Sequence, residues 1–262
     1  MHGTVLRVER LTPSMVRVVL GDPGLEGFSP GDWTDGYVNA QFLPAGADYD
    51  VPFDDEHVRT LPREQRPAAR RYTVRRWDQA RRELVLDVVV HGDEGVAGRW
   101  AQTAAPGDRL QLRGPSGGYA PDPAADWHLL VGDESALPAI AVAAERVPAG
   151  AVVRVVLEVD GPDAELPLAC PGQLEVTWVH RRGDGAGQLL AAVASLVRPP
   201  GRVHAFVHGE AVATREVRAL LLGEWAVPRE DLSVSPYWRR TFTDERWREV
   251  KAQWLAEVER DV

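Results

Sequence analysis

A chain of 262 residues can form one large domain or two ordinary ones. With 44% hydrophobic and 26% charged residues it has the composition of a globular protein, which excludes a disordered chain. The net charge of −9 argues against nucleic-acid binding, and no apolar window reaches the ~20 residues of a membrane helix. A single cysteine, Cys170, excludes an internal disulfide framework, and no secretory signal is visible, so we expect a cytoplasmic protein.

The first half of the chain predicts antiparallel strands. Apolar and polar residues alternate in short segments separated by Gly, Pro and Asp, a pattern typical of half-buried strands in a barrel or sandwich. These segments are Thr4–Leu11, Met15–Leu20, Gly36–Leu43, Arg71–Trp77, Glu83–His91 and Arg109–Leu112. A short helix is expected at Val96–Ala104, and the polar, Pro-rich segment Pro44–Arg66 predicts a long mobile loop.

The pattern changes after a turn-rich stretch that ends near residue 126. Apolar runs then alternate with helical patterns, as in a parallel, doubly wound sheet. Strands are predicted at Trp127–Gly132, Val152–Val159, Leu174–Val179 and Val203–Val207, and helices at Ala136–Arg146, Ala186–Val197, Ala211–Leu222 and Thr243–Val262. We therefore predict an N-terminal antiparallel β-barrel over residues 1–122 and a parallel α/β nucleotide-binding domain with a C-terminal helix over residues 123–262. This layout is similar to that of the ferredoxin-reductase group of flavoenzymes.

The first motif is Arg70-Arg71-Tyr72-Thr73, on a predicted strand. A flavin needs an apolar surface for stacking, a polar contact near N5 and positive charge for its pyrophosphate. Arg70 and Tyr72 lie two residues apart and so share one face of the strand, while Thr73 can offer its N–H or hydroxyl. The alternative interpretation is an edge strand with a solvated basic face.

The second motif, HGDEGVAGRW (His91–Trp100), joins the end of a strand to the start of a helix through a glycine-containing turn. Helix N-termini present unpaired N–H groups and partial positive charge, which suit a pyrophosphate. Small residues at Ala97 and Gly98 let an anion approach the backbone. The alternative is an ordinary strand–turn–helix connection.

The third motif is GDESALPA (Gly132–Ala139), at the carboxyl end of the first strand of the second domain. Ligands of open α/β sheets bind at this location. The segment is not a G-x-G-x-x-G fingerprint, and Asp133, Glu134 and Ser135 can instead cap the following helix.

Together, and in this order, the three motifs resemble the siderophore-interacting protein family of FAD-dependent ferric-siderophore reductases. Members of that family show R-x-Y-T-x-R, H-G-x-x-G-P-A-x-x-W and G-D-E-T-A-L-P-A, which read here as RRYTVR, HGDEGVAGRW and GDESALPA. Gly114–Tyr119, Gly209-Glu210 and Tyr237–Arg240 extend the resemblance over nearly the whole chain.

The resemblance implies an NAD(P)H-linked oxidoreductase that reduces the Fe(III) of a siderophore to the more weakly bound Fe(II). Hydride passes from NAD(P)H to flavin N5 and electrons leave the flavin singly, so no side chain is expected to act as acid or base. By the same resemblance the cofactor-binding residues are Arg70, Tyr72 and Thr73 at the flavin, His91, Gly95, Val96, Ala97 and Trp100 near the pyrophosphate, and Gly132, Asp133, Glu134, Ser135, Ala136 and Glu210 near the nicotinamide cofactor.

The sequence departs from the family pattern at three positions, and the first of them bears on the substrate. Asn39 stands where members often carry a lysine that attracts anionic siderophores, Val96 replaces a proline, and Pro236 lies where glycine is usual. Losing a cation at position 39 weakens the attraction of an anionic chelate, although Arg239 and Arg240 can compensate as substrate-binding residues. The alternatives are therefore a flavin reductase or redox partner in a biosynthetic pathway, and a binding module that has lost flavin.

The choice of coenzyme depends on charges after the second and third strands of the α/β domain. Glu158 and Asp160 favour a free ribose hydroxyl and hence NADH, which we expect, while Arg181 and Arg182 can instead hold a 2′-phosphate. His204 and His208 lie four apart in a predicted strand, so no metal site is expected. We expect a monomer whose partner is a small ferric chelate, without nucleic acid or membrane.

Overall fold

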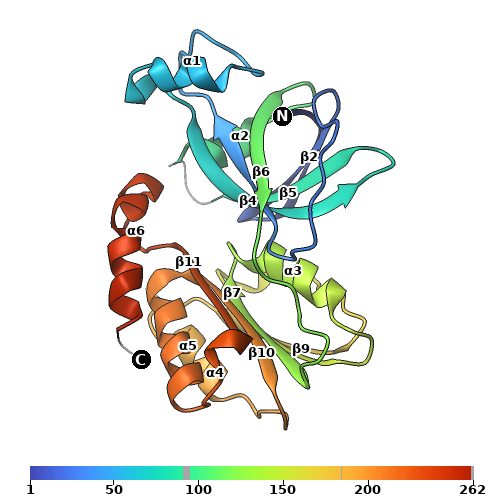
Figure 1. The fold of residues 1–262 in the computed structure, drawn as a ribbon, viewed down its shortest axis with the longest axis vertical. Coiled ribbons are helices and arrows are strands. Elements are labelled where there is room, and N and C mark those ends of the chain that lie inside the picture. The colour runs from blue at the N-terminus through green and yellow to red at the C-terminus, as the bar shows by residue number, and fades with distance from the viewer. Residues whose placement is uncertain (91–94, 184, 261–262) are drawn as a thin grey trace. The chain divides into compact units, whose positions relative to one another are not determined.

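The computed structural model describes residues 1–90, 95–183 and 185–260 (Figure 1). The chain divides into two compact units, Met1–Ala120 and Pro121–Val262. The first is built on a closed barrel and the second on an open parallel sheet, as the sequence predicts.

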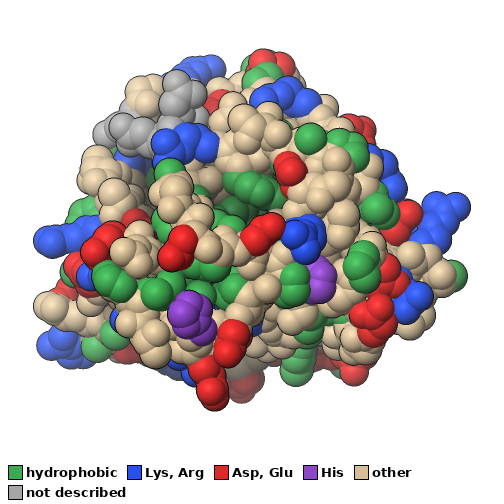
Figure 2. Space-filling model, turned by 90° about the horizontal axis from the view of Figure 1, so that it is seen from above, with side chains coloured by type: hydrophobic (Ala, Val, Ile, Leu, Met, Phe, Trp, Pro, Cys, Tyr) green, Lys and Arg blue, Asp and Glu red, His purple; other side chains and the backbone are tan. Residues whose placement is uncertain are grey.

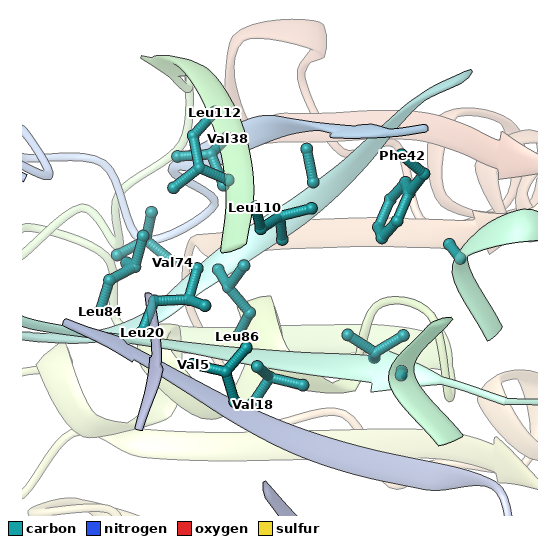
Figure 3. Close-up of a cluster of buried hydrophobic side chains, with 14 of the residues drawn as sticks. Val5, Val18, Leu20, Val38, Phe42, Val74, Leu84, Leu86, Leu110 and Leu112 are labelled. Atoms are coloured by element: carbon teal, nitrogen blue, oxygen red, sulfur yellow. The ribbon is translucent and has the colours of Figure 1, made fainter. Parts of the chain in front are cut away.

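The barrel has six strands in the spatial order β1-β2-β5-β4-β3-β6, and its paired strands are antiparallel. Alternate side chains from these strands meet in one buried hydrophobic cluster (Figure 3). Strands β2, β3, β5 and β6 contribute every second residue to this cluster, which is the alternation that the sequence displays. The strands are β1 (His2–Thr12), β2 (Met15–Gly21), β3 (Tyr37–Phe42), β4 (Ala68–Asp78), β5 (Glu83–Val89) and β6 (Arg109–Ser116).

Two helices accompany the barrel, and one of them corrects the sequence prediction. Helix α2 (Val96–Thr103) lies where a helix was expected. Helix α1 (Asp55–Thr60) lies inside the segment Pro44–Arg66, so the prediction of a continuous loop there is wrong. Asp54 caps α1 by accepting a hydrogen bond from the backbone N–H of the second helical residue at 2.8 Å, and Val58 is buried. One capping carboxylate and one buried apolar side chain stabilise this short helix.

The second unit is a five-stranded parallel sheet in the order β11-β10-β7-β8-β9. Helices α4 and α5 pack on the face that carries Trp127, Leu129 and Val131. A Cβ built on the next residue, Gly132, would contact Ile140 of α3, which places α3 on the opposite face. The strands are β7 (Trp127–Asp133), β8 (Val152–Val159), β9 (Gln173–His180), β10 (Val203–Glu210) and β11 (Leu232–Trp238), and the helices are α3 (Leu137–Arg146), α4 (Gln188–Ala194), α5 (Ala211–Gly223) and α6 (Asp244–Val258).

Strand β11 is a strand that the sequence pattern did not predict. Pro236 lies within it, and proline has no N–H to donate to a ladder, which argues against a central strand. The position of β11 at the edge of the sheet explains the discrepancy, because edge strands tolerate proline.

Charged side chains of both signs are interspersed over the face of the molecule that Figure 2 shows. This distribution differs from the single basic stripe of a typical nucleic-acid-binding surface. In the part of the chain that the structure describes, no helix combines the length and apolar character needed to cross a membrane.

Candidate functional site

The R-x-Y-T motif lies on β4, next to β3. The ring of Tyr72 is partly buried against the barrel core and makes an edge-to-face contact with Phe42, with 6.1 Å between ring centroids. Thr73 is buried, with 8% of its surface exposed, and Arg70 is half-buried. The motif therefore presents an aromatic ring, a hydroxyl and a guanidinium within one strand.

The start of α2 suits an anion. Among the residues that the structure describes, no side chain caps this helix, so its first backbone N–H groups have no capping partner there. Gly95 precedes it with φ +95°, a conformation that favours glycine, and a Cβ at Gly98 would have its nearest neighbour 3.9 Å away. Val96 and Ala97 supply backbone N–H groups with small side chains, and His91 lies outside the described residues.

Phe42 brings these two motifs together. Its ring lies 6.1 Å from that of Tyr72 and 5.5 Å from that of Trp100 in α2, and both contacts are edge-to-face. The aromatic strand and helix α2 are thus neighbours on the barrel. One molecule that carries both a flat ring and a pyrophosphate can reach both, so these residues fit FAD.

Asn39 lies between two arginines. Across the ladders of β3 it pairs with Arg71 of β4 on one side and with Arg113 of β6 on the other. Arg113 donates to Asp55 of α1 at 2.6 Å, while the exposed Arg71 lies over the Tyr37 ring at 5.5 Å from its centroid. From the sequence, position 39 is a lost cation, but the strand register places a guanidinium on each side of it.

In the second unit, the carboxyl ends of β7, β10 and β11 meet at Asp133, which is 3% exposed. Its carboxylate accepts hydrogen bonds from the Ser135 backbone at 2.9 Å and from the Ser135 hydroxyl. It also accepts from the Glu210 backbone at 2.7 Å and from the Trp238 indole at 2.8 Å. Asp133 and Ser135 were expected near the nicotinamide cofactor, and the structure uses Asp133 to hold three strand ends together.

Two glycines permit this close packing. Gly209 has φ +141°, and a Cβ there would lie 2.6 Å from a carboxylate oxygen of Asp133. A Cβ at Gly132 would lie 2.6 Å from the His208 carbonyl oxygen and 2.7 Å from the Cβ of Ala136. Any larger residue at either position would force the strand ends apart.

Glu210 caps helix α5. Its carboxylate accepts hydrogen bonds from the N–H groups of Val212 at 2.7 Å and Ala213 at 3.0 Å, and a negative charge at a helix start is favourable. The other carboxylate oxygen accepts from the Arg240 backbone at 3.1 Å. Glu210 therefore fixes the turn after β11 to the start of α5.

Arg239 and Arg240, expected to serve the substrate together, lie in different surroundings. One guanidinium nitrogen of Arg240 lies 4.0 Å from a carboxylate oxygen of Glu158. The Arg239 guanidinium lies 4.7 Å from the centroid of the Phe242 ring, and the Arg246 guanidinium lies 5.9 Å from the same centroid. These last three side chains line a groove of about 200 Å³ beside α6.

Arg181, which follows β9, is held by three carboxylates. It donates to both oxygens of Glu134 at 2.7 and 3.2 Å, to Glu158 at 2.9 Å, and to Asp160. Burial raises the pKa of Glu134 and of Glu158, and their hydrogen bonds to Arg181 oppose this. Burial alone would lower the pKa of Arg181, but the same hydrogen bonds raise it above its usual value. These four residues are called the Arg181 cage below.

The histidines of β10 are engaged in hydrogen bonds. His208 bonds the Tyr237 hydroxyl at 2.9 Å and the Ser233 hydroxyl at 3.0 Å, and its ring stacks on Phe206. Burial lowers the pKa of His208 to about 3, so the ring is neutral at physiological pH. His204 accepts a hydrogen bond from a backbone N–H at 3.1 Å. Searching the described ranges finds no group of three or more His, Cys, Asp or Glu side chains that could hold a metal ion.

Family models match both units. Residues 4–119 match the siderophore-interacting FAD-binding domain, and residues 125–241 match the siderophore-interacting protein model. The chain belongs to the siderophore-interacting protein family. The resemblance of its motifs to this family is thereby confirmed.

Relatives in this family span most of the chain. An uncharacterized protein of Mycobacterium tuberculosis is 45% identical, with 97% of this chain and 95% of that protein covered. Ferric vibriobactin reductase ViuB of Vibrio cholerae is 34% identical, with 94% and 92% covered. An NADPH-dependent ferric-chelate reductase of Escherichia coli is 38% identical over 137 residues, which cover 52% of this chain and 53% of that protein. With its FAD-binding domain, this siderophore-interacting protein is an oxidoreductase.

Solved structures agree with the predicted fold class. A siderophore utilization protein from T. fusca superimposes with a TM-score of 0.79 at 36% identity, covering 93% of this chain and 94% of that one. The ferredoxin reductase of a carbazole 1,9a-dioxygenase gives a TM-score of 0.68 at 14% identity, covering 91% and 69%. The second likeness shows the shared fold alone, and it confirms that the fold is of the ferredoxin-reductase type.

The sequence pattern did not predict the contacts of Arg181 or the arginines beside Asn39, although it carried a signal for the contacts of Arg181. The ends of adjacent parallel strands meet at one edge of a sheet, so acidic residues after β7 and β8 predict an encounter with Arg181 after β9. The arginines beside Asn39 needed the register of three antiparallel strands, which the sequence pattern does not give.

Proposed function

We propose that this chain reduces the ferric iron of a siderophore, with FAD as cofactor and NADH as electron donor. The observation that carries the proposal is the pair of ring contacts through Phe42, which sets the R-x-Y-T strand beside helix α2, whose start no described side chain caps. The match of residues 4–119 to an FAD-binding domain and a relative named ferric vibriobactin reductase support it.

FAD, when bound, supplies the redox chemistry, since it accepts a hydride and gives up electrons one at a time. Tyr72 provides the stacking ring, Thr73 the polar contact near N5, and Arg70 the positive charge. The backbone N–H groups of Val96 and Ala97 hold the pyrophosphate, because they begin a helix that none of the described side chains caps. Gly95 and Trp100 complete this part of the proposed cofactor site. The protein thus contributes position and charge.

The substrate is an anionic chelate that guanidinium groups attract. On the barrel, the exposed Arg71 and its ladder partner Asn39 provide a cation and an amide on the same face of neighbouring strands. Of the two arginines expected for the substrate in the α/β unit, Arg239 lies over the Phe242 ring and Arg240 lies near Glu158. We assign Arg71 the attraction that the family's lysine gives elsewhere.

The donor is NADH because acidic residues dominate the edge where the adenosine ribose binds in folds of this type. Glu158 and Asp160 lie at and just after the end of β8, and Arg181, the nearest cation, is already held by carboxylates. A free 2′-hydroxyl fits such surroundings better than a 2′-phosphate does.

The test begins with the visible spectrum of the purified protein, followed by anaerobic titration with NADH and NADPH. We expect a flavin spectrum, faster bleaching by NADH, and reoxidation by a ferric siderophore with formation of Fe(II). Failure to bind FAD on reconstitution would contradict the proposal. Faster turnover with free flavin or a quinone than with ferric chelates would favour a flavin reductase or a redox partner of a biosynthetic pathway, which the amide at Asn39 permits.

A further inference from the structure

The Arg181 cage joins the ends of three adjacent strands. Glu134 follows β7, Glu158 lies at the end of β8 with Asp160 just beyond, and Arg181 follows β9. In doubly wound sheets a dinucleotide binds beyond these strand ends, and the residue after the second strand faces the adenosine ribose. The cage therefore lies where the adenosine ribose is expected, and the 2′ position of this ribose carries a hydroxyl in NADH and a phosphate in NADPH.

Arg181 has almost no hydrogen-bonding capacity left for a phosphate. Its Nε donates to Glu158, one terminal nitrogen donates to Glu134 and Asp160, and the other donates to Glu134. These bonds account for four of the five N–H donors of a guanidinium. Tight phosphate recognition by arginine commonly uses two parallel N–H donors, so the cage as it stands cannot offer that contact.

The members of the cage differ in how easily they can be removed. Glu134 and Glu158 are 7% and 5% exposed, so separating either from Arg181 would leave a buried charge unpaired. The side chain of Asp160 is 59% exposed and remains solvated without Arg181. Asp160 is the member whose loss releases one guanidinium N–H while the buried pairs stay intact.

We propose that Asp160 sets the coenzyme preference, because it occupies one N–H donor of Arg181 and adds negative charge where a 2′-phosphate would lie. Arg181 is then a latent 2′-phosphate ligand that Asp160 blocks. The inference rests on the proposed function, since it takes NAD(P)H as the electron donor.

The test measures the affinity of the FAD-loaded protein for NAD⁺ and NADP⁺ by calorimetry, which needs no turnover. Wild-type protein should bind NAD⁺ more tightly. Asp160→Asn should shift the affinity ratio toward NADP⁺ by about tenfold, since one nearby negative charge is removed and the neutral amide oxygen that replaces it holds the Arg181 N–H less strongly. In the double variant with Arg181→Lys, which keeps the charge but lacks the planar fork, most of this gain should disappear.

Two exposed neighbours serve as matched controls. Asp163→Asn removes one carboxylate from the same loop, and Arg182→Gln, combined with Asp160→Asn, removes the adjacent guanidinium. Asp163→Asn should leave the ratio of NAD⁺ to NADP⁺ affinity as in the wild type. Arg182→Gln should leave this ratio as in Asp160→Asn alone. An unchanged ratio in Asp160→Asn, an equal shift in Asp163→Asn, or loss of the gain with Arg182→Gln would each overturn the inference.

Failure of the proposed function gives a different result. If wild-type protein binds neither NAD⁺ nor NADP⁺, the inference fails together with the proposed electron donor. If NAD⁺ binds and ferric iron is reduced while Asp160→Asn leaves the ratio unchanged, only the role of Asp160 is overturned.

Discussion

The carboxylate of Asp133 accepts a hydrogen bond from the indole N–H of Trp238 at 2.8 Å, although the two residues lie 105 positions apart. The same oxygen accepts from the backbone of Glu210 at 2.7 Å. One buried carboxylate therefore fixes the ends of β7, β10 and β11 relative to one another. The motifs Gly132–Ala139, Gly209-Glu210 and Tyr237–Arg240, which resemble those of the family, lie at these three strand ends.

We expect Asp133→Asn to lower the free energy of unfolding by about 2 kcal/mol or more, because hydrogen bonds to a buried charge are lost and an amide N–H would face other donors. Urea denaturation followed by circular dichroism measures the effect. Asp163→Asn, which changes an exposed carboxylate in the same unit, should cost less than about 0.5 kcal/mol. Equal costs for the two variants would show that the Asp133 hydrogen bonds contribute little.

The barrel and the parallel sheet were largely predictable, because the hydrophobic pattern of each strand is visible within its own short stretch of sequence. Helix α1 and strand β11 were not. Pro and polar residues around Asp54 concealed a short capped helix, and Pro236 concealed a strand that only its edge position makes possible. Local pattern cannot reveal a strand's place in the order of a sheet.

The site was predictable as a set of motifs but not as a set of contacts. Sequence analysis assigned Glu210 and Asp133 to the nicotinamide cofactor, yet their carboxylates are hydrogen-bonded to a helix start and to an indole. Arg181 was weighed as a ligand of a 2′-phosphate, and the structure places it among three carboxylates. These contacts depend on the register of strands far apart in sequence.

Replacing Tyr72 by alanine should weaken FAD binding about tenfold, because the ring proposed to stack on the flavin is lost. The ratio of flavin to protein absorbance after gel filtration, and titration of the apoprotein with FAD, measure the change. Tyr72→Phe keeps the ring and its contact with Phe42, so it should retain most of the flavin. Full flavin content in the alanine variant would exclude Tyr72 as the stacking residue.

Replacing Glu210 by alanine should destabilise the protein by about 1–2 kcal/mol, since helix α5 loses its cap and the Arg240 backbone loses an acceptor. Glu210→Gln retains an oxygen for capping and should cost about half as much. Thermal and urea unfolding measure both. If Glu210 also contacts the coenzyme, Glu210→Gln should raise KM for NADH beyond what its small stability change explains.

The free energy of unfolding should decrease as the pH falls from about 6.5 toward 4, and His128 is one cause. Its side chain is fully buried, and within the described part of the chain neither ring nitrogen has a hydrogen-bond partner. Burial, followed by the charge of nearby His204, lowers the pKa of His128 to about 4. In this window the unfolded chain binds a proton that the native state does not, so acid favours unfolding.

His128→Leu should therefore reduce the pH dependence of the unfolding free energy by about 1 kcal/mol per pH unit between pH 6 and pH 4.5. Urea denaturation at several pH values measures this slope. His57→Gln, a change at an exposed histidine of the other unit, is the matched control. A slope that stays the same after the His128 change would assign the acid sensitivity to other groups, such as the buried His208.

Pro236 and Lys251 together have a consequence for how copies of this protein behave at high concentration. Exposed edges of β-sheets are templates on which other chains can add strands and aggregate. At Pro236 the edge strand offers no N–H, and its carbonyl accepts a hydrogen bond from the Lys251 ammonium of α6 at 2.6 Å. A second chain could not form a continuous hydrogen-bond ladder along this edge at Pro236, and the Lys251 ammonium places a positive charge beside it. We therefore expect this edge of the sheet to resist strand addition by other copies.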